Sequence, residues 1–367
     1  MVAEFTSDIM RHYLSTEMFN QPKYKYMEQQ THITERMRSI LIDWIIEVHF
    51  QFKLKSESLF LTINLIDRYL EKIRVSKENL QLVGVSAMLI ACKYEEIWPP
   101  LIKDYIHMCD NAYNKDQIIN MELSMLSELD FDVDFVSAFA LLERFSAMNK
   151  DTHQTACLAQ YLIEISLLDY DSIRIKPSYL AASALFLARS LLRHPEPHSS
   201  VLAQCIHYTQ NQLQAVAQLL IRLLKNYQKP TYQLVGLKKK FASDQFANVS
   251  QLYHFESQPQ DNPNSCSHNK SIAGLSTDQT RGSAQQAITT DKKRTKSGDH
   301  LMANLTTQKS NSSSFATSTK KKGATFRFKQ QKQSSKQLES NFGQKQGYAN
   351  NQTDVQIVPA NEQRQSS

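Results

Sequence analysis

Apolar residues recur every three or four positions from about residue 31 to residue 228, which is the spacing of one face of an α-helix. A clear example begins at Ser56, where Leu59, Ile63 and Ile66 fall on one side of the helix that the pattern predicts. No stretch of comparable length shows the apolar–polar alternation of a β-strand. The sequence therefore predicts an all-α body whose helices are separated by short polar or proline-containing breaks.

Two local signals predict where helices begin. Asn114 is followed three residues later by Gln117, a variant of the capping box in which side chains satisfy exposed backbone N–H groups. Pro177 can occupy the first turn of another helix, because the N–H group that proline lacks would have no partner there.

An internal repeat appears when the body is compared with itself at an offset of 97 residues. Residues 86–91 then align with residues 183–188, both rich in small side chains, and residues 65–67 align with residues 162–164. The Asn114/Gln117 signal aligns with Asn211/Gln214. The repeat predicts two helical bundles of similar plan, each with its small-residue helix at the centre, where neighbouring helices can pack closely.

The helix predicted over residues 34–52 has apolar side chains on more than one face. A second stripe, formed by Ile42, Ile45, Ile46 and His49, accompanies the first. The helix is therefore either wholly buried or exposes part of one stripe to a partner. Periodicity alone favours burial. The first stripe comprises Met37, Ile40, Leu41, Trp44 and Val48.

Four charged residues stand out against this apolar background. Arg38 and Asp67 are single charges inside apolar helices, and a buried ion pair is the simplest account of them. Lys93 ends a predicted helix, where a cation complements the helix dipole, and Glu122 could belong to an ordinary solvated face.

Charge and composition change beyond about residue 245. Residues 251–367 carry 16 basic and 8 acidic residues (+8), whereas residues 1–250 carry 26 and 28 (−2). Ser, Thr, Asn and Gln make up 54 of these 117 residues, so the segment is predicted to be a disordered, basic, Gln/Asn/Ser-rich tail. Basic clusters at residues 292–296 and 320–322 could be nuclear-import signals or could simply keep the tail soluble.

Composition also excludes several classes of function. Only Gly84 and Gly236 occur in the first 250 residues, which argues against phosphate-binding glycine loops, and no catalytic constellation is visible. The five cysteines show no C-x-x-C pair, so reduced thiols are expected and no metal or cofactor site is predicted. No apolar run approaches the roughly 18 residues of a membrane span. We therefore expect a non-enzymatic protein of the nucleus and cytoplasm that neither enters membranes nor uses a cofactor.

Several of these segments together resemble the cyclin box of mitotic A/B-type cyclins. The resemblance lies in residues 37–44, where Ser39 replaces the usual alanine, in residues 65–70, in residues 80–100, and in residues 168–171, which lean towards the B type. It covers about residues 8–245. It implies an N-terminal helix and lead-in over 1–30, two consecutive five-helix cyclin-box folds over 31–133 and 134–245, and a tail over 246–367.

The resemblance implies a regulatory subunit that binds and activates a cyclin-dependent Ser/Thr protein kinase and controls G2/M-type progression of the cell cycle. Lys93 and Glu122 match the family's polar kinase-binding pair, and Arg38 and Asp67 match its buried ion pair. The apolar kinase contacts beside the polar pair match Tyr94, Leu126, Phe131 and Val133.

The resemblance also implies a docking groove for Arg-x-Leu motifs in substrates or inhibitors, which reverses the preference for burial given above. The matching positions are Met37, Ile40, Leu41, Trp44, Glu47, Leu80 and Gln81. One alternative is a nucleic-acid-binding transcription factor built on paired cyclin folds, but the body's charge of −2 argues against it, so no nucleic-acid partner is expected. Another is a scaffold on the same fold that binds no kinase.

Overall fold

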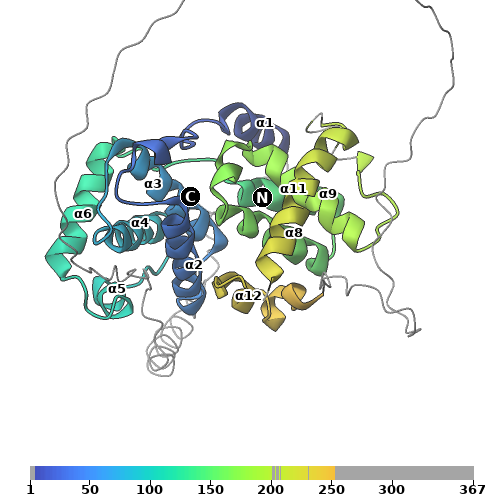
Figure 1. Ribbon diagram of the computed structural model, residues 1–367. Helices are drawn as coiled ribbons and strands as arrows, with labels where there is room; N and C mark the ends of the chain where they lie inside the picture. Colours follow the sequence, from blue (N-terminus) through green and yellow to red (C-terminus); the bar gives the residue numbers. More distant parts are fainter. Residues whose placement is uncertain (1–4, 201–202, 204–205, 207, 230, 253–367) are drawn as a thin grey trace, which may run out of the picture. The chain divides into compact units, whose positions relative to one another are not determined.

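The computed structural model describes residues 5–252, except 201–202, 204–205, 207 and 230. All regular elements within these residues are helices, which confirms the all-α prediction (Figure 1). The predicted tail from residue 253 onward, including both basic clusters, lies outside the described part. No described helix is long and apolar enough to cross a membrane.

The first bundle has five helices, of which one is central and the other four surround it. These are α2 (Glu35–Gln51), α3 (Ser56–Lys72), α4 (Leu80–Glu95), α5 (Ile102–Met108) and α6 (Lys115–Glu128). Helix α4 packs against the other four and is buried almost without interruption from Leu80 to Cys92 (Figure 1). A Cβ atom at Gly84 would lie 2.8 Å from Leu41 Cδ1, so the absence of a side chain lets α4 approach α2 closely. The central position predicted for this small-residue helix is confirmed.

The second bundle repeats this plan with α7 (Ala138–Asn149), α8 (His153–Leu167), α9 (Pro177–Leu191) and α11 (Gln210–Gln228). Helix α9 packs against the other three, and its small residues from Ala181 to Ala184 are fully buried. Pro177 is the first residue of α9, as predicted. Residues 201–207, between α9 and α11, are only partly described.

The capping boxes show where the offset of 97 residues is wrong. Asn114 caps α6, accepting a hydrogen bond from the Gln117 N–H group while Gln117 accepts one from Asn114. In the second bundle the box is made by Thr209 and Gln212, and Asn211 lies inside α11. Threonine serves the same capping chemistry as asparagine, so the equivalent helix begins two residues earlier than the repeat predicts.

Segments at both ends of the body connect the two bundles. Helix α1 (Thr6–Thr16) is followed by the buried Glu17, whose carboxylate accepts hydrogen bonds from the N–H (2.8 Å) and hydroxyl (3.0 Å) of Ser178 at the start of α9. After α11, the short helix α12 (Gly236–Lys240) packs against α2 of the first bundle. Four short 3-10 helices complete the described elements: η2 (Tyr26–Gln29), η3 (Tyr170–Arg174), η4 (Asp244–Phe246) and η5 (Val249–Gln251).

Candidate functional site

Lys93 and Glu122 form an ion pair at the surface of the first bundle. Lys93 lies in the last turn of α4, Glu122 lies on α6, and Lys93 Nζ is 2.5 Å from Glu122 Oε1. The Lys93 side chain is 50% exposed and that of Glu122 is 12% exposed. An exposed pair of this kind contributes at most about 1 kcal/mol to stability. The pair is therefore accessible to a partner mainly through Lys93, and breaking it costs the fold little.

Large apolar side chains surround the chain segments that carry this pair. Tyr94 is 54% exposed and Phe131 is 64% exposed, while Leu126 and Val133 are half-buried. Sequence reasoning missed Ile97 and Trp98, which follow α4 and are 78% and 77% exposed. Ile119 and Leu123, on α6, are also exposed. The available signal was two large apolar residues in a proline-terminated loop, where no helical face can bury them.

Phe131 has a backbone conformation that is unusual for an aromatic residue. Its φ angle is 57° and that of Asp130 is 56°, in the left-handed region. The Phe131 N–H group donates to the Leu126 carbonyl at 2.8 Å, closing the end of α6. A strained backbone that exposes an aromatic ring costs stability, and such strain is concentrated at functional sites.

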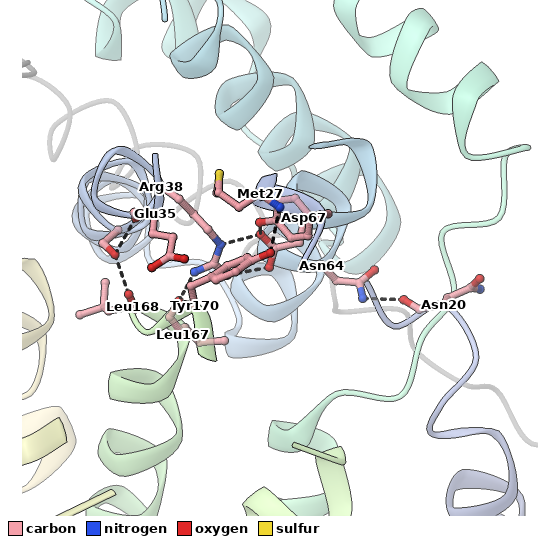
Figure 2. Close-up of polar contacts among 11 residues, drawn as sticks. Asn20, Met27, Glu35, Arg38, Asn64, Asp67, Leu167, Leu168 and Tyr170 are labelled. Carbon is pink, nitrogen blue, oxygen red and sulfur yellow. Dashed lines mark hydrogen bonds and ion pairs between the residues drawn. The ribbon is translucent and has the colours of Figure 1, made fainter. Parts of the chain in front are cut away.

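Arg38 and Asp67 form a buried bidentate ion pair between α2 and α3 (Figure 2). Arg38 Nε donates to Asp67 Oδ1 at 2.7 Å and Nη2 donates to Oδ2 at 2.6 Å, and the two side chains are 1% and 4% exposed. The Tyr26 hydroxyl also donates to Asp67. Burial, followed by the Asp67 charge, raises the pKa of Tyr26 well above its usual value. Burial disfavours the Arg38 guanidinium, but Asp67 and Tyr26 together outweigh it, and the pKa of Arg38 is raised.

The same arginine connects the two bundles. Its Nη1 donates to the carbonyl of Leu167 at the end of α8, 3.0 Å away (Figure 2). The neighbouring Ser39 hydroxyl donates to the Leu168 carbonyl at 2.7 Å. An alanine at position 39 could not make this bond, so the departure from the usual family residue adds a contact between the bundles. This cluster holds the fold together and is inaccessible to a partner.

Only part of the expected docking patch lies at the surface. Met37, Leu41 and Leu80 are buried in the core, whereas Ile40, Trp44, Glu47 and Gln81 are half-buried at the surface. The second stripe of α2, including Ile42, Ile45 and Ile46, is fully buried. Both readings of α2 therefore apply to different side chains of the same helix.

The acid of this patch is already paired within the chain. Lys239 Nζ of α12 lies 2.6 Å from Glu47 Oε1, with Lys239 59% exposed and Glu47 20% exposed. One turn earlier on α2, the Asp43 carboxylate accepts backbone N–H groups of Val235 (3.1 Å) and Gly236 (2.9 Å). Burial and the nearby Glu47 charge raise the pKa of Asp43 to about 6.

A second buried ion pair was not anticipated from the sequence. Lys240 Nζ contacts both carboxylate oxygens of Glu164 on α8, at 2.7 and 2.8 Å, and the two side chains are 1% and 0% exposed. Burial lowers the pKa of Lys240 despite this partner. A signal existed, because Glu164 is the residue that the internal repeat aligns with Asp67. Each bundle thus holds an acid at the equivalent position, paired with a buried cation from another segment.

The fold and the surface together define a class of protein. It is a duplicated helical protein with an exposed charged and apolar surface on its first bundle. Among the described residues, no group of three or more His, Cys, Asp or Glu side chains is placed to hold a metal ion.

Comparison with known proteins agrees with this class. The family "Cyclin, N-terminal domain" matches residues 8–134, and "Cyclin, C-terminal domain" matches residues 133–254. The chain is 39% identical over 251 residues to Cyclin-B2-2 of Arabidopsis thaliana, covering 68% of this chain and 58% of that protein. It is 41% identical over 252 residues to the G2/mitotic-specific cyclin-B of Marthasterias glacialis, covering 69% and 64%.

A solved viral cyclin from herpesvirus saimiri shares the fold, with a TM-score of 0.51 at 20% sequence identity, over 60% of this chain and 97% of that one. The chain belongs to the cyclin family, and the two relatives named above are B-type cyclins. It spans about three fifths of the length of those relatives.

Proposed function

We propose that this chain is a mitotic-type cyclin, the regulatory subunit that binds and activates a cyclin-dependent Ser/Thr protein kinase. The observation that carries the proposal is the exposed Lys93–Glu122 pair, accompanied by the exposed rings of Tyr94 and Phe131. Charged groups fix the register of a complex, and apolar side chains around them supply buried area and exclude water. One of the relatives is named a G2/mitotic-specific cyclin, which supports a role at the G2/M stage of the cell cycle.

In this proposal the cyclin contributes no reacting group. Its rigid first bundle holds the mobile helix of the kinase where that helix's glutamate can pair with the ATP-binding lysine. Helices α4 and α6 suit this task because they pack directly on each other, so the two halves of the ion pair keep a fixed separation. The kinase then pays less conformational entropy to reach its active state.

The test measures activation of a monomeric cyclin-dependent kinase by the full chain, with phosphorylation of a Ser/Thr-Pro peptide as the readout. We expect the Lys93→Ala, Glu122→Ala double variant to need at least about tenfold more protein for half-maximal activation, since a central interface residue typically contributes about 2 kcal/mol. The matched control is Lys25→Ala, Glu28→Ala, which removes another exposed pair, 3.6 Å apart. Equal activation by both variants would contradict the proposed interface, and no activation by the unmodified chain would contradict the function.

We also propose that the surface around Ile40, Trp44 and Glu47 docks substrate or inhibitor segments containing an Arg-x-Leu motif. An aliphatic surface suits the leucine, and a carboxylate suits the arginine. Ile40 and Trp44 are half-exposed and Glu47 keeps one fifth of its side chain in contact with solvent. Binding of a labelled Arg-x-Leu peptide that is lost in Trp44→Ala but retained in Lys25→Ala would support this. Salt-sensitive retention of DNA by the chain would instead favour the nucleic-acid alternative.

A further inference from the structure

The cation that contacts Glu47 belongs to a firmly attached part of the chain. Lys239 lies between Gly236 and Lys240, and both are fixed to other helices. Lys240 makes the buried ion pair with Glu164, and the Gly236 N–H group donates to Asp43. The residue before Lys239, Lys238, donates its N–H group to the Tyr227 hydroxyl at 3.0 Å. The backbone that carries Lys239 is therefore held at several points, which keeps its side chain within reach of Glu47.

Gly236 is what allows this approach. A Cβ atom there would lie 2.6 Å from the Asp43 carbonyl oxygen and 2.7 Å from Glu47 Cγ, closer than real Cβ contacts. Any side chain at this position would push α12 away from α2 and move Lys239 away from the acid. The glycine and the lysine together place a positive charge beside Glu47, whereas the docking proposal requires the negative charge of Glu47 to be free for an arginine.

The surrounding charges do not restore that negative charge. Asp43, the other acid of this helix face, has its carboxylate engaged by two backbone N–H groups and is buried. Lys238 is exposed beside Lys239 and adds a second positive charge at the surface. An arginine arriving from a partner must displace Lys239 or share Glu47 with it.

We infer that Lys239 is a built-in competitor for the docking acid Glu47, so that this chain selects docking segments by their apolar side chains and gains little from an arginine. The inference rests on the docking function proposed above and specifies its substrate class: segments with a leucine anchor, whether or not an arginine precedes it. The apolar contribution of Ile40 and Trp44 is unaffected by Lys239, whereas the electrostatic contribution of Glu47 is already used.

The test compares three fluorescein-labelled peptides that share one sequence except at the two motif positions: Arg-x-Leu, Gln-x-Leu and Arg-x-Ala. Dissociation constants for the full chain are measured by fluorescence anisotropy at low ionic strength. The protein variants are Lys239→Gln, Glu47→Gln and Lys238→Gln. The last is the matched control, because it removes a neighbouring exposed lysine that makes no ion pair with Glu47 in the structure.

We expect the unmodified chain to bind Arg-x-Leu and Gln-x-Leu within about threefold of each other, since exposed ion pairs contribute little when a competitor is present. Lys239→Gln should strengthen Arg-x-Leu binding about two- to fivefold and leave Gln-x-Leu unchanged. Lys238→Gln should leave the ratio of the two affinities close to that of the unmodified chain. Glu47→Gln should remove any remaining preference for arginine.

A preference for arginine of more than about tenfold in the unmodified chain, or a ratio that Lys239→Gln does not change, would overturn the inference while leaving docking intact. Equal binding of Arg-x-Leu and Arg-x-Ala would show that no leucine-dependent docking occurs, and both the docking proposal and this inference would fail. Kinase activation, measured separately, distinguishes either result from failure of the kinase proposal.

Discussion

Replacing Asp67 with asparagine should destabilise the protein strongly, because the change removes the carboxylate that pairs with Arg38 while keeping the shape of the side chain. The Arg38 guanidinium is 1% exposed and cannot reach solvent without unfolding of its surroundings. Its other contacts are neutral: the carbonyl of Leu167 accepts from Nη1, and the ring of Tyr170 lies 6.0 Å from the guanidinium carbon. The variant therefore holds an almost uncompensated positive charge between the two bundles.

The contacts of Asp67 determine how much free energy of unfolding the variant loses. Of the two charge-assisted hydrogen bonds, at 2.7 and 2.6 Å, one is lost because the asparagine NH2 group is a donor facing a donor, and the other loses its ionic character. The Tyr26 hydroxyl loses a charged acceptor. Breaking a buried pair from one side typically costs about 3–5 kcal/mol, a large part of the roughly 5–15 kcal/mol that stabilises a folded domain. By contrast, Glu122→Gln breaks an exposed pair and should cost no more than about 1 kcal/mol.

The assay is urea unfolding of the full chain, followed by circular dichroism, for Asp67→Asn, Glu122→Gln and the double variant Arg38→Met, Asp67→Leu. Replacing both charges with apolar side chains removes the buried charge altogether, so the double variant should recover at least about half of the loss. A cost below about 1 kcal/mol for Asp67→Asn, or a double variant as unstable as the single one, would refute the assignment of this pair as a buried, mutually dependent unit.

Three further changes test other contacts of the body. Ser39→Ala removes one hydrogen bond between the bundles and should lower the free energy of unfolding in urea by about 1 kcal/mol. Gly236→Ala forces a Cβ atom against the Asp43 carbonyl, so α12 should detach and limited proteolysis should cut near residue 236 faster than in the unmodified chain. Burial, with a smaller contribution from Lys240, lowers the pKa of His49 to about 3, so between about pH 6.5 and 3 the unfolded state binds a proton that the folded state does not. Stability should therefore fall by about 1.4 kcal/mol per pH unit as the pH drops through this window, and His49→Gln should remove that contribution when urea unfolding is compared at pH 7 and pH 5.

Much of the helical framework was predictable because its signals are local. The capping box at Asn114 and the first-turn proline at Pro177 each satisfy or avoid unpaired backbone groups, and the structure places helices where those signals predict them. The central small-residue helices were predictable for a related reason, since close packing of helices requires small side chains at the contact. These features depend on residues within one or two turns of each other.

The return of the chain to the first bundle was not predictable in this way. Nothing near Lys240 in the sequence indicates that its ammonium group is buried against Glu164, 76 residues earlier. A run of three lysines resembles a solvated face, and two of the three are indeed exposed. Only the path of α12 across α2 and α8 separates the buried cation from its neighbours.

The two ion pairs of the first bundle show most directly what sequence spacing cannot predict. Arg38 and Asp67 are 29 residues apart in the sequence, and so are Lys93 and Glu122. Spacing and residue type therefore cannot separate a buried pair from an exposed one. What separates them is the second bundle, which covers Arg38 with the Leu167 carbonyl and the ring of Tyr170, while Lys93 lies in the last turn of its helix with half of its side chain exposed. The second bundle buries the Arg38–Asp67 pair, which can therefore only stabilise the architecture. It leaves the Lys93–Glu122 pair exposed and available for recognition.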